Sequence, residues 1–305
     1  MDDIVAVLNS TLRLTTPIAY VTLGAVVLEK SGVNAMAMEG TMLVGAFGAV
    51  VGSWFTGSAW LGVLTGILFA VLISLVRSFL CVSHQADQTV SGVGINILAS
   101  GMTAMLLKVI WNMDGKSDVV TALSDWSIPF VENIPVVGEI IGKQNPLVYL
   151  LFPVLIGCCL LLGHTPFGLR LAAVGEHPEV LSSLGLSVYR YRYIATILSG
   201  ILAGIGGAYL SIGQLSFFTQ DMASGRGFMA LAACIFGRWT ALGGFLGALL
   251  FGFAEAVQIR LQSWVQYTQF IRMIPYAVTI LVLRGFVRKR SGAPAASGKP
   301  YQEQQ

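Results

Sequence analysis

The chain has 305 residues, of which 55% are hydrophobic and only 11% are charged, and its formal net charge is +3. A soluble domain carries about 25% charged residues, so this composition excludes an ordinary soluble protein and indicates a membrane protein with several spans. The basic residues gather in a few loops and near the C-terminal end. They therefore indicate orientation in a lipid bilayer and argue against nucleic-acid binding.

Eight apolar windows are long enough to cross a bilayer, whose hydrocarbon core needs about 20 residues of helix. They are Thr11–Glu29, Glu39–Thr56, Trp60–Leu80, Gln88–Trp111, Leu147–Gly163, Tyr193–Ile212, Leu242–Gln262 and Phe270–Val287. A further apolar run, Gly227–Gly237, is too short to cross alone and is predicted to be a half-span or a short, broken helix. The predicted fold class is all-α, a polytopic helical bundle of about eight to nine spans.

Orientation follows from the positions of Lys and Arg in short loops. Basic residues follow the third and last spans and lie in the loop before the sixth: Arg77, Arg170, Arg190, Arg192, Arg284, Arg288, Lys289 and Arg290. The long connection 112–146 is rich in acidic residues, which is typical of the outer side. Nine crossings, with the N-terminus out and the C-terminus in, satisfy this pattern except at Arg260 and Arg272. The small, polar residues 291–305 are predicted to form a disordered cytoplasmic tail.

The two halves of the chain share a weak pattern, in which two glycine-rich spans flank a polar turn. The first turn holds Asn34 and Glu39, and the second holds Gln214, Asp221 and Arg226. Opposite sidedness of the two turns predicts an inverted repeat, which places a solute path between the halves. Glycines at helical spacing, such as Gly62 with Gly66 and Gly200 with Gly204, permit close helix approach, and tight packing alone also explains them.

Charged groups at membrane depth are costly, so each needs a partner or a function. Glu39 opens the second span, where capping of a helix N-terminus and contact with a substrate both fit its position. Glu255 lies within a span, with Gln258 and Arg260 near it in the sequence. For Glu255 a structural pairing is favoured over ligand contact.

Uncharged polar and aromatic side chains provide further candidates for a solute path. Gln88, Ser91 and Asn96 fall on one side of the predicted fourth span, and such a stripe either binds a neighbouring helix or lines a path. Gln214 lies in the second polar turn, and Phe217 offers a flat apolar face for a ring. Amide and hydroxyl groups of this kind suit a neutral, hydrogen-bonding solute.

Several enzymatic and coupling motifs are missing from the sequence. Gly142-Lys143 and Gly298-Lys299 lack the leading glycine and the Ser/Thr of a phosphate-binding loop, so the chain is not expected to hydrolyse ATP. His84, His164 and His177 lack the spacing of a metal site or a metalloprotease. A proton-driven secondary transporter and an intramembrane enzyme are both disfavoured, because ionisable and paired catalytic groups are scarce along the spans.

A charged, amphipathic loop, FGLRLAAVGEHPEVLSSLGLSVYRYR (Phe167–Arg192), separates two apolar spans. Pro178 stands where a helix tolerates proline, Val180, Leu181 and Leu184 form a helical apolar face, and Gly185 is predicted to end the helix. The glutamate-to-glycine spacing from Glu179 resembles the loop motif of ABC importer permeases, in which a short helix docks into a groove on the ATPase. An interfacial amphipathic helix would have the same pattern.

Longer runs make the resemblance specific. They are LRLTTPIAYVTLGAVVLEKSGVNAMAMEGTMLVGAFGAVVGS, ADQTVSGVGINILASG, TPFGLRLAAVGEHPEVLSSLGLSVYRYRYIATILSGILAGIGGAYLSIG and DMASGRGFMALAACIFGRWTALGGFLGALLFGFAEAVQIRLQ. Together they resemble the permease subunits of bacterial nucleoside ABC importers, within the branched-chain amino acid and ribose permease superfamily. The resemblance extends from Leu12 to Val287. It departs from the family at Val180 and Leu181, where alanines usually follow the glutamate.

The resemblance implies a multi-pass permease of the bacterial inner membrane that imports purine or pyrimidine nucleosides by alternating access and is not itself an enzyme. Residues 1–290 would form the transmembrane domain, with the cytoplasmic loop 166–192 carrying the ATPase-coupling helix. Implied partners are a paralogous permease, a cytoplasmic ATPase and an extracytoplasmic substrate-binding lipoprotein. No cofactor and no nucleic acid are implied. The alternatives are a permease of the same superfamily for a simple sugar or other small metabolite, and a secondary transporter.

The resemblance also suggests roles for individual residues. Those expected to couple to the ATPase are Gly175, Glu176, Pro178, Glu179, Leu181, Leu184 and Gly185. Those expected to line or gate the solute path, chosen for polarity and position, are Asn34, Glu39, Gln88, Ser91, Asn96, Gln214, Phe217 and Asp221.

Overall fold

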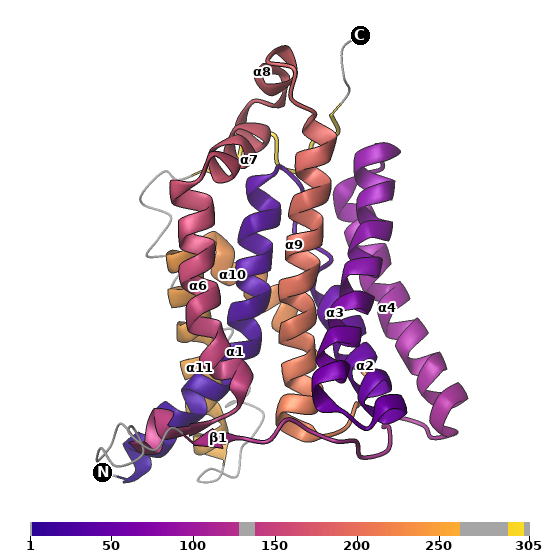
Figure 1. Ribbon diagram of the computed structural model, residues 1–305, viewed down its shortest axis with the longest axis vertical. Coiled ribbons are helices and arrows are strands. Elements are labelled where there is room, and N and C mark those ends of the chain that lie inside the picture. Colours follow the sequence, from indigo (N-terminus) through magenta and orange to yellow (C-terminus); the bar gives the residue numbers. More distant parts are fainter. Residues whose placement is uncertain (1, 128–137, 263–291, 302–305) are drawn as a thin grey trace.

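The computed structural model describes residues 2–127, 138–262 and 292–301. Within these ranges seven helices are long and apolar enough to cross a membrane (Figure 1). They are α1 (Asp2–Lys30), α2 (Met38–Thr56), α3 (Ala59–Ser78), α4 (Gln88–Trp111), α6 (Pro146–His164), α9 (Val188–Ala208) and α11 (Ala241–Gln262). Each contains or nearly matches a predicted span, whereas the eighth predicted span, Phe270–Val287, lies outside the described residues.

Shorter elements connect or extend these helices. Three π-helical turns are η1 (Phe79–Ser83), η2 (Gly138–Gly142) and η3 (Tyr209–Leu215), of which η1 continues α3 and η3 continues α9. Two short strands, β1 (Trp126–Ser127) and β2 (Lys143–Gln144), pair antiparallel within the long connection before α6. The prediction of a largely helical membrane protein is confirmed.

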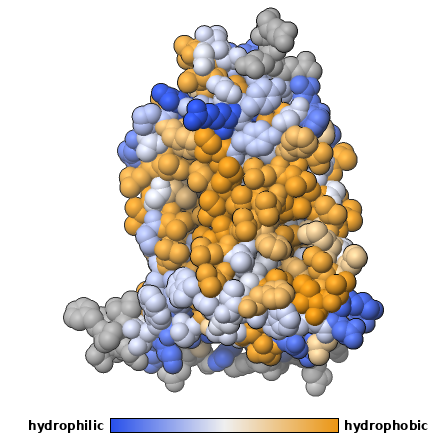
Figure 2. Space-filling model, turned by 45° about the vertical axis from the view of Figure 1, so that its right-hand side comes forward, coloured by the Kyte–Doolittle hydropathy of each residue, from blue (hydrophilic) through white to orange (hydrophobic). Residues whose placement is uncertain are grey.

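Three spans form the centre of the bundle. In each of the spans α1, α2 and α9, between 78 and 89% of the most apolar segment is buried. In α3, α4, α6 and α11 the corresponding share is only 22 to 39%. The outer helices keep large apolar side chains exposed, among them Ile97 and Met105 on α4. Figure 2 shows the resulting apolar belt between two more polar ends, the surface expected of a protein that sits in a bilayer.

Glycines bring α2, α3 and α9 together at backbone distance. A Cβ added at Gly66 would lie 2.7 Å from the carbonyl oxygen of Gly45, and one added at Gly204 would lie 2.7 Å from the Cα of Ile67. Real side chains cannot occupy such positions without moving a neighbouring helix. The predicted close approach at these small residues is therefore confirmed.

The short helix α10 (Arg226–Phe236) has only 11 residues and forms where the sequence predicts a broken element. The start of α2 also lies inside the bundle, since its first turn is hydrogen-bonded to Asn96 of α4. Asn96 lies eight residues inside α4, which corresponds to about 12 Å along a helix axis. Two helix N-termini thus lie within the bundle, well away from its ends.

One end of the molecule carries α7 (Pro166–Glu176) and α8 (Pro178–Ser183), and the N-terminus lies at the opposite end (Figure 1). Residues 292–301, here called the C-terminal strap, pack beside α7 and α8. Ala296 and Tyr301 of the strap are buried, with exposed fractions of 7% and 6%. The structure therefore differs from the predicted disorder over this part of the tail, because the small residue Ala296 lies against Gly32 and its N–H binds the Gly175 carbonyl oxygen.

Candidate solute path and coupling loop

Glu39 joins the N-termini of α2 and α10. It stands in the first turn of α2, and its two carboxylate oxygens accept hydrogen bonds from the backbone N–H groups of Gly225 and Gly227, each at 2.7 Å. A Cβ at Gly227 would lie 2.4 Å from the backbone N and Cα of Glu39, so the two chains touch here. Of the two roles that fit Glu39, the geometry supports capping, and the helix it caps is α10.

Asn96 fixes the beginning of α2. Its Oδ1 accepts a hydrogen bond from the N–H of Gly40 at 2.8 Å, and its Nδ2 donates to the carbonyl oxygen of Met36 at 2.9 Å. The amide therefore satisfies the Gly40 N–H, which helix geometry leaves without an internal partner, and also binds the carbonyl oxygen of the residue before the N-cap.

Gln88 and Ser91 make further contacts from the same face of α4. Gln88 is buried, and its Oε1 accepts a hydrogen bond from the N–H of Asn34 at 2.7 Å, while Arg77 donates to the Asn34 carbonyl oxygen. Ser91 Oγ lies 2.7 Å from Cys81 Sγ. Of the two roles left open for this polar stripe, the structure supports contact with neighbouring segments.

Asp221 and Ser100 form an exposed polar pair beside α4. Ser100 Oγ donates a hydrogen bond of 2.6 Å to Asp221 Oδ1. Ser100 lies near the midpoint of α4, and Asp221 is exposed. A carboxylate at this depth needs water, a polar solute or a protein partner around it. Sequence reasoning missed Ser100, although its spacing of four residues from Asn96 extends the stripe along α4.

The segment that carries Asp221 is held in an unusual conformation. Asp221 and Ser224 have φ values of +52° and +48°, which non-glycine residues adopt only rarely. The segment follows the π-helical turn η3, and both features cluster at functional sites in other proteins. The geometry thus marks the turn before α10 as a candidate site.

The other two predicted path residues lie in the preceding turn. Gln214 Nε2 donates to the carbonyl oxygen of Arg13 on α1 at 3.1 Å, so this amide binds a neighbouring helix. Phe217 is half-buried. Its neighbour Phe218 is buried, with its ring edge-on to Phe47 at a centroid distance of 5.3 Å.

Glu255 of α11 pairs with Arg226, the first residue of α10. Their Oε1 and Nη2 atoms are 2.5 Å apart, and the two side chains are only 14% and 18% exposed. The favoured structural role of Glu255 is therefore confirmed, with a partner from α10. Together with Glu39, this ion pair fixes the N-terminus of α10 from two sides.

The amphipathic loop 166–192 forms the helix that the sequence predicts. Pro178 is the first residue of α8 and Ser183 the last. Gly185 has a φ of +74°, and the N–H of Leu186 donates to the carbonyl oxygen of Leu181 at 3.1 Å, which closes the helix end. The residues of the predicted apolar face do not share one environment. Leu181 is buried, with 3% of its surface exposed, whereas Leu184 is 71% exposed.

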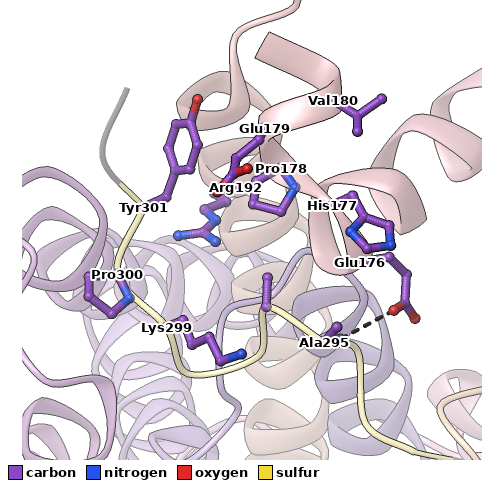
Figure 3. A pocket seen from close by; sticks show the side chains of 11 residues that line it. Glu176, His177, Pro178, Glu179, Val180, Arg192, Ala295, Lys299, Pro300 and Tyr301 are labelled. Carbon is purple, nitrogen blue, oxygen red and sulfur yellow. Dashed lines mark hydrogen bonds between the residues drawn. The ribbon is translucent and has the colours of Figure 1, made fainter. Parts of the chain in front are cut away.

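The remaining coupling residues lie where α7 meets α8. A Cβ at Gly175 would lie 2.3 Å from the carbonyl oxygen of Lys30, so α7 touches the end of α1 at this glycine. Glu176, Pro178 and Glu179 line a cavity of about 580 Å³ that opens between α8 and the C-terminal strap, with Arg192 on its wall (Figure 3). The structure thus gathers the predicted coupling residues at one end of the molecule.

Comparison with known proteins agrees with this architecture. Residues 7–283 match the family described as branched-chain amino acid transport system / permease component. The guanosine ABC transporter permease protein NupQ of Bacillus subtilis is 37% identical over 98% of both chains. The nucleoside ABC transporter permease protein NupC of Lactococcus lactis is 35% identical over 94% of this chain and 93% of the relative.

A solved structure of an inward-facing, metal-chelate type ABC transporter superposes with a TM-score of 0.55 at 17% identity. It covers 91% of this chain and 86% of the other, and at this identity the likeness concerns the fold alone. The family match covers most of the chain, including six of the seven described spans in full and the first from residue 7 onward. The chain therefore belongs to the family of branched-chain amino acid transport system permease components.

Proposed function

We propose that the chain is the membrane permease subunit of an ABC importer that takes up nucleosides. The observation that carries this proposal is the similarity over nearly the full length to two relatives that bear the names of guanosine and nucleoside permeases. The alternatives of a sugar permease and a secondary transporter are not favoured. ATP hydrolysis takes place on a separate subunit, since these relatives are permease proteins of ABC transporters.

The same relationship supports a set of partners. The chain pairs with a paralogous permease, binds a cytoplasmic ATPase through α8, and receives solute from an extracytoplasmic lipoprotein. It lies in the bacterial inner membrane, with α7 and α8 on the cytoplasmic side, where the basic residues collect. The exposed apolar side chains Val180 and Leu184 suit a groove on the ATPase, because a solvated surface gains nothing from them.

The solute path runs past the turn before α10. Asp221 and Ser100 supply a carboxylate and a hydroxyl that can bind ribose hydroxyls or base N–H groups, and Phe217 offers an aromatic face for the base. Glu39, Asn34, Gln88, Ser91 and Asn96 support this path by fixing the helix starts around it. A neutral solute suits a site in which Glu39 is bonded to the start of α10 and Arg226 is paired with Glu255.

Uptake of labelled guanosine, adenosine and uridine tests the proposed function. We expect cells lacking this chain and any other nucleoside route to lose uptake, and restoration of the chain to recover it. Depletion of ATP at constant membrane potential should abolish the recovered uptake. Recovery that survives ATP depletion, or recovery for a labelled sugar and for none of the nucleosides, would contradict the proposal.

Replacing Asp221 by asparagine tests the solute path. Losing a hydrogen bond to a charged group costs about 1.5–3 kcal/mol, so we expect uptake to fall by about tenfold or more. The melting temperature of the purified complex should stay unchanged, because Asp221 is exposed. Asp114→Asn is the matched control, because the exposed ion pair between Asp114 and Lys108 contributes at most about 1 kcal/mol to stability. Equal uptake in both variants would exclude Asp221 from the path.

A further inference from the structure

The C-terminal strap binds the coupling helices through backbone and side-chain hydrogen bonds. The N–H of Ala296 donates to the carbonyl oxygen of Gly175 at 2.8 Å. The N–H of Ala295 donates to Glu176 Oε2 at 3.2 Å (Figure 3). Both acceptors lie in the last turn of α7, immediately before α8. The strap therefore holds the point from which α8 projects.

The same strap also binds the first half of the chain. The N–H of Gly298 donates to the carbonyl oxygen of Gly32 at 3.2 Å, and Ser297 Oγ donates to Glu29 Oε2 at 3.0 Å. Gln88 connects the strap to the segment before α2, because its Nε2 donates to the Lys299 carbonyl oxygen at 3.4 Å while its Oε1 accepts from the N–H of Asn34 at 2.7 Å. Ten residues thus link the end of α1, the segment before α2 and the coupling helices.

Tyr301 anchors the end of the strap. It packs with Val174, Leu181 and Val188, and its ring centroid lies 5.7 Å from that of Tyr189. The buried guanidinium of Arg192 lies 5.9 Å from the Tyr301 ring, within the range of a cation–π contact. Within the described parts of the chain, Arg192 Nε and Nη2 have no hydrogen-bond partner. The Tyr301 ring is therefore one partner of this buried charge.

We infer that the C-terminal strap is a transmission element, which carries movement of α8 to α2 and, through Glu39, to α10. The inference rests on the proposed function, since the ATPase supplies the movement. Without the strap, α7 still touches the end of α1 at Gly175. What is lost is the strap's own hydrogen bond to Gly32 and its contact with Gln88, which in turn binds the segment before α2. The strap positions the coupling helices.

Tyr301→Ala, studied in the assembled importer, tests this role. We expect uptake per transporter to fall by about tenfold, a typical size for energetic coupling between sites. Binding of the ATPase subunit and ATP hydrolysis should continue, so that hydrolysis becomes uncoupled from uptake. Tyr301→Phe keeps the ring and should restore uptake. A chain ending at Tyr301 should behave as the full chain, and one ending at Ser291 should behave as Tyr301→Ala.

Lys299→Ala is the matched control, because Lys299 is exposed and Gln88 binds only its backbone carbonyl oxygen. Its uptake should equal that of the unaltered chain. Normal uptake in Tyr301→Ala would overturn the transmission role, and so would loss of ATPase binding together with uptake, which would make the strap part of the docking surface only. An unaltered chain that binds no ATPase would contradict the proposed function itself.

Discussion

Replacing Glu39 by alanine should destabilise the transmembrane domain and abolish uptake. The change leaves the N–H groups of Gly225 and Gly227 without their acceptors. Each unpaired buried donor costs about 1–3 kcal/mol, and more where no water reaches it. We expect the melting temperature of the purified permease to fall by several degrees, together with the loss of uptake in cells.

Two further variants make this result interpretable. Gly227→Val disrupts the same contact from the side of α10, because the added Cβ would clash with the Glu39 backbone. It should give the same phenotype, and the double variant should be little worse than either single one. Gly157→Val on α6 is the control, since nothing lies within 4 Å of a Cβ at Gly157. If Glu39→Ala lost uptake at an unchanged melting temperature, Glu39 would be a solute-binding group.

Replacing Gly185 by valine should uncouple the permease from its ATPase while the protein remains folded in the membrane. Gly185 has a φ of +74°, where a side chain costs about 1–2 kcal/mol and a β-branched one more. The strain opens the end of α8 and displaces the exposed Leu184. We expect uptake to be lost and co-purification of the ATPase to be reduced, with an unchanged amount of permease in the membrane.

Gly163→Val provides the comparison for Gly185→Val. Gly163 lies in the last turn of α6, has open space around its Cα and lacks a positive φ. This control should import normally, because its added side chain meets no neighbour. Normal uptake and ATPase binding in Gly185→Val would remove α8 from the coupling role.

The helices could be predicted from the sequence because their signals are local. The fourth predicted span matches α4 at both ends, where Asp87 caps the first N–H groups and Asn112 adopts a left-handed conformation after the last turn. Pro178 and Gly185 define α8 in the same way. Such start and stop signals act within a few residues.

The partners of the polar groups could not be predicted in this way. Polarity and depth show that Glu39 needs a partner, but Gly227 lies 188 residues further along the chain. Ser100 was missed because a single serine in an apolar helix is ordinarily satisfied by its own backbone. The small, polar composition of the strap predicts disorder, although small size is what lets Ala296 lie against Gly32 and bind the Gly175 carbonyl oxygen.

The contact of Glu39 with the two half-buried helix starts balances the charge at the centre of the protein. The N-terminus of a helix carries roughly half a positive charge, so α2 and α10 together offer about one. One carboxylate therefore neutralises both ends, and the nearby Arg226–Glu255 pair is neutral by itself. On the proposed function, an uncharged solute meets no net charge from these helix starts, and the exposed Asp221 carboxylate is the charged group that the proposed path offers it.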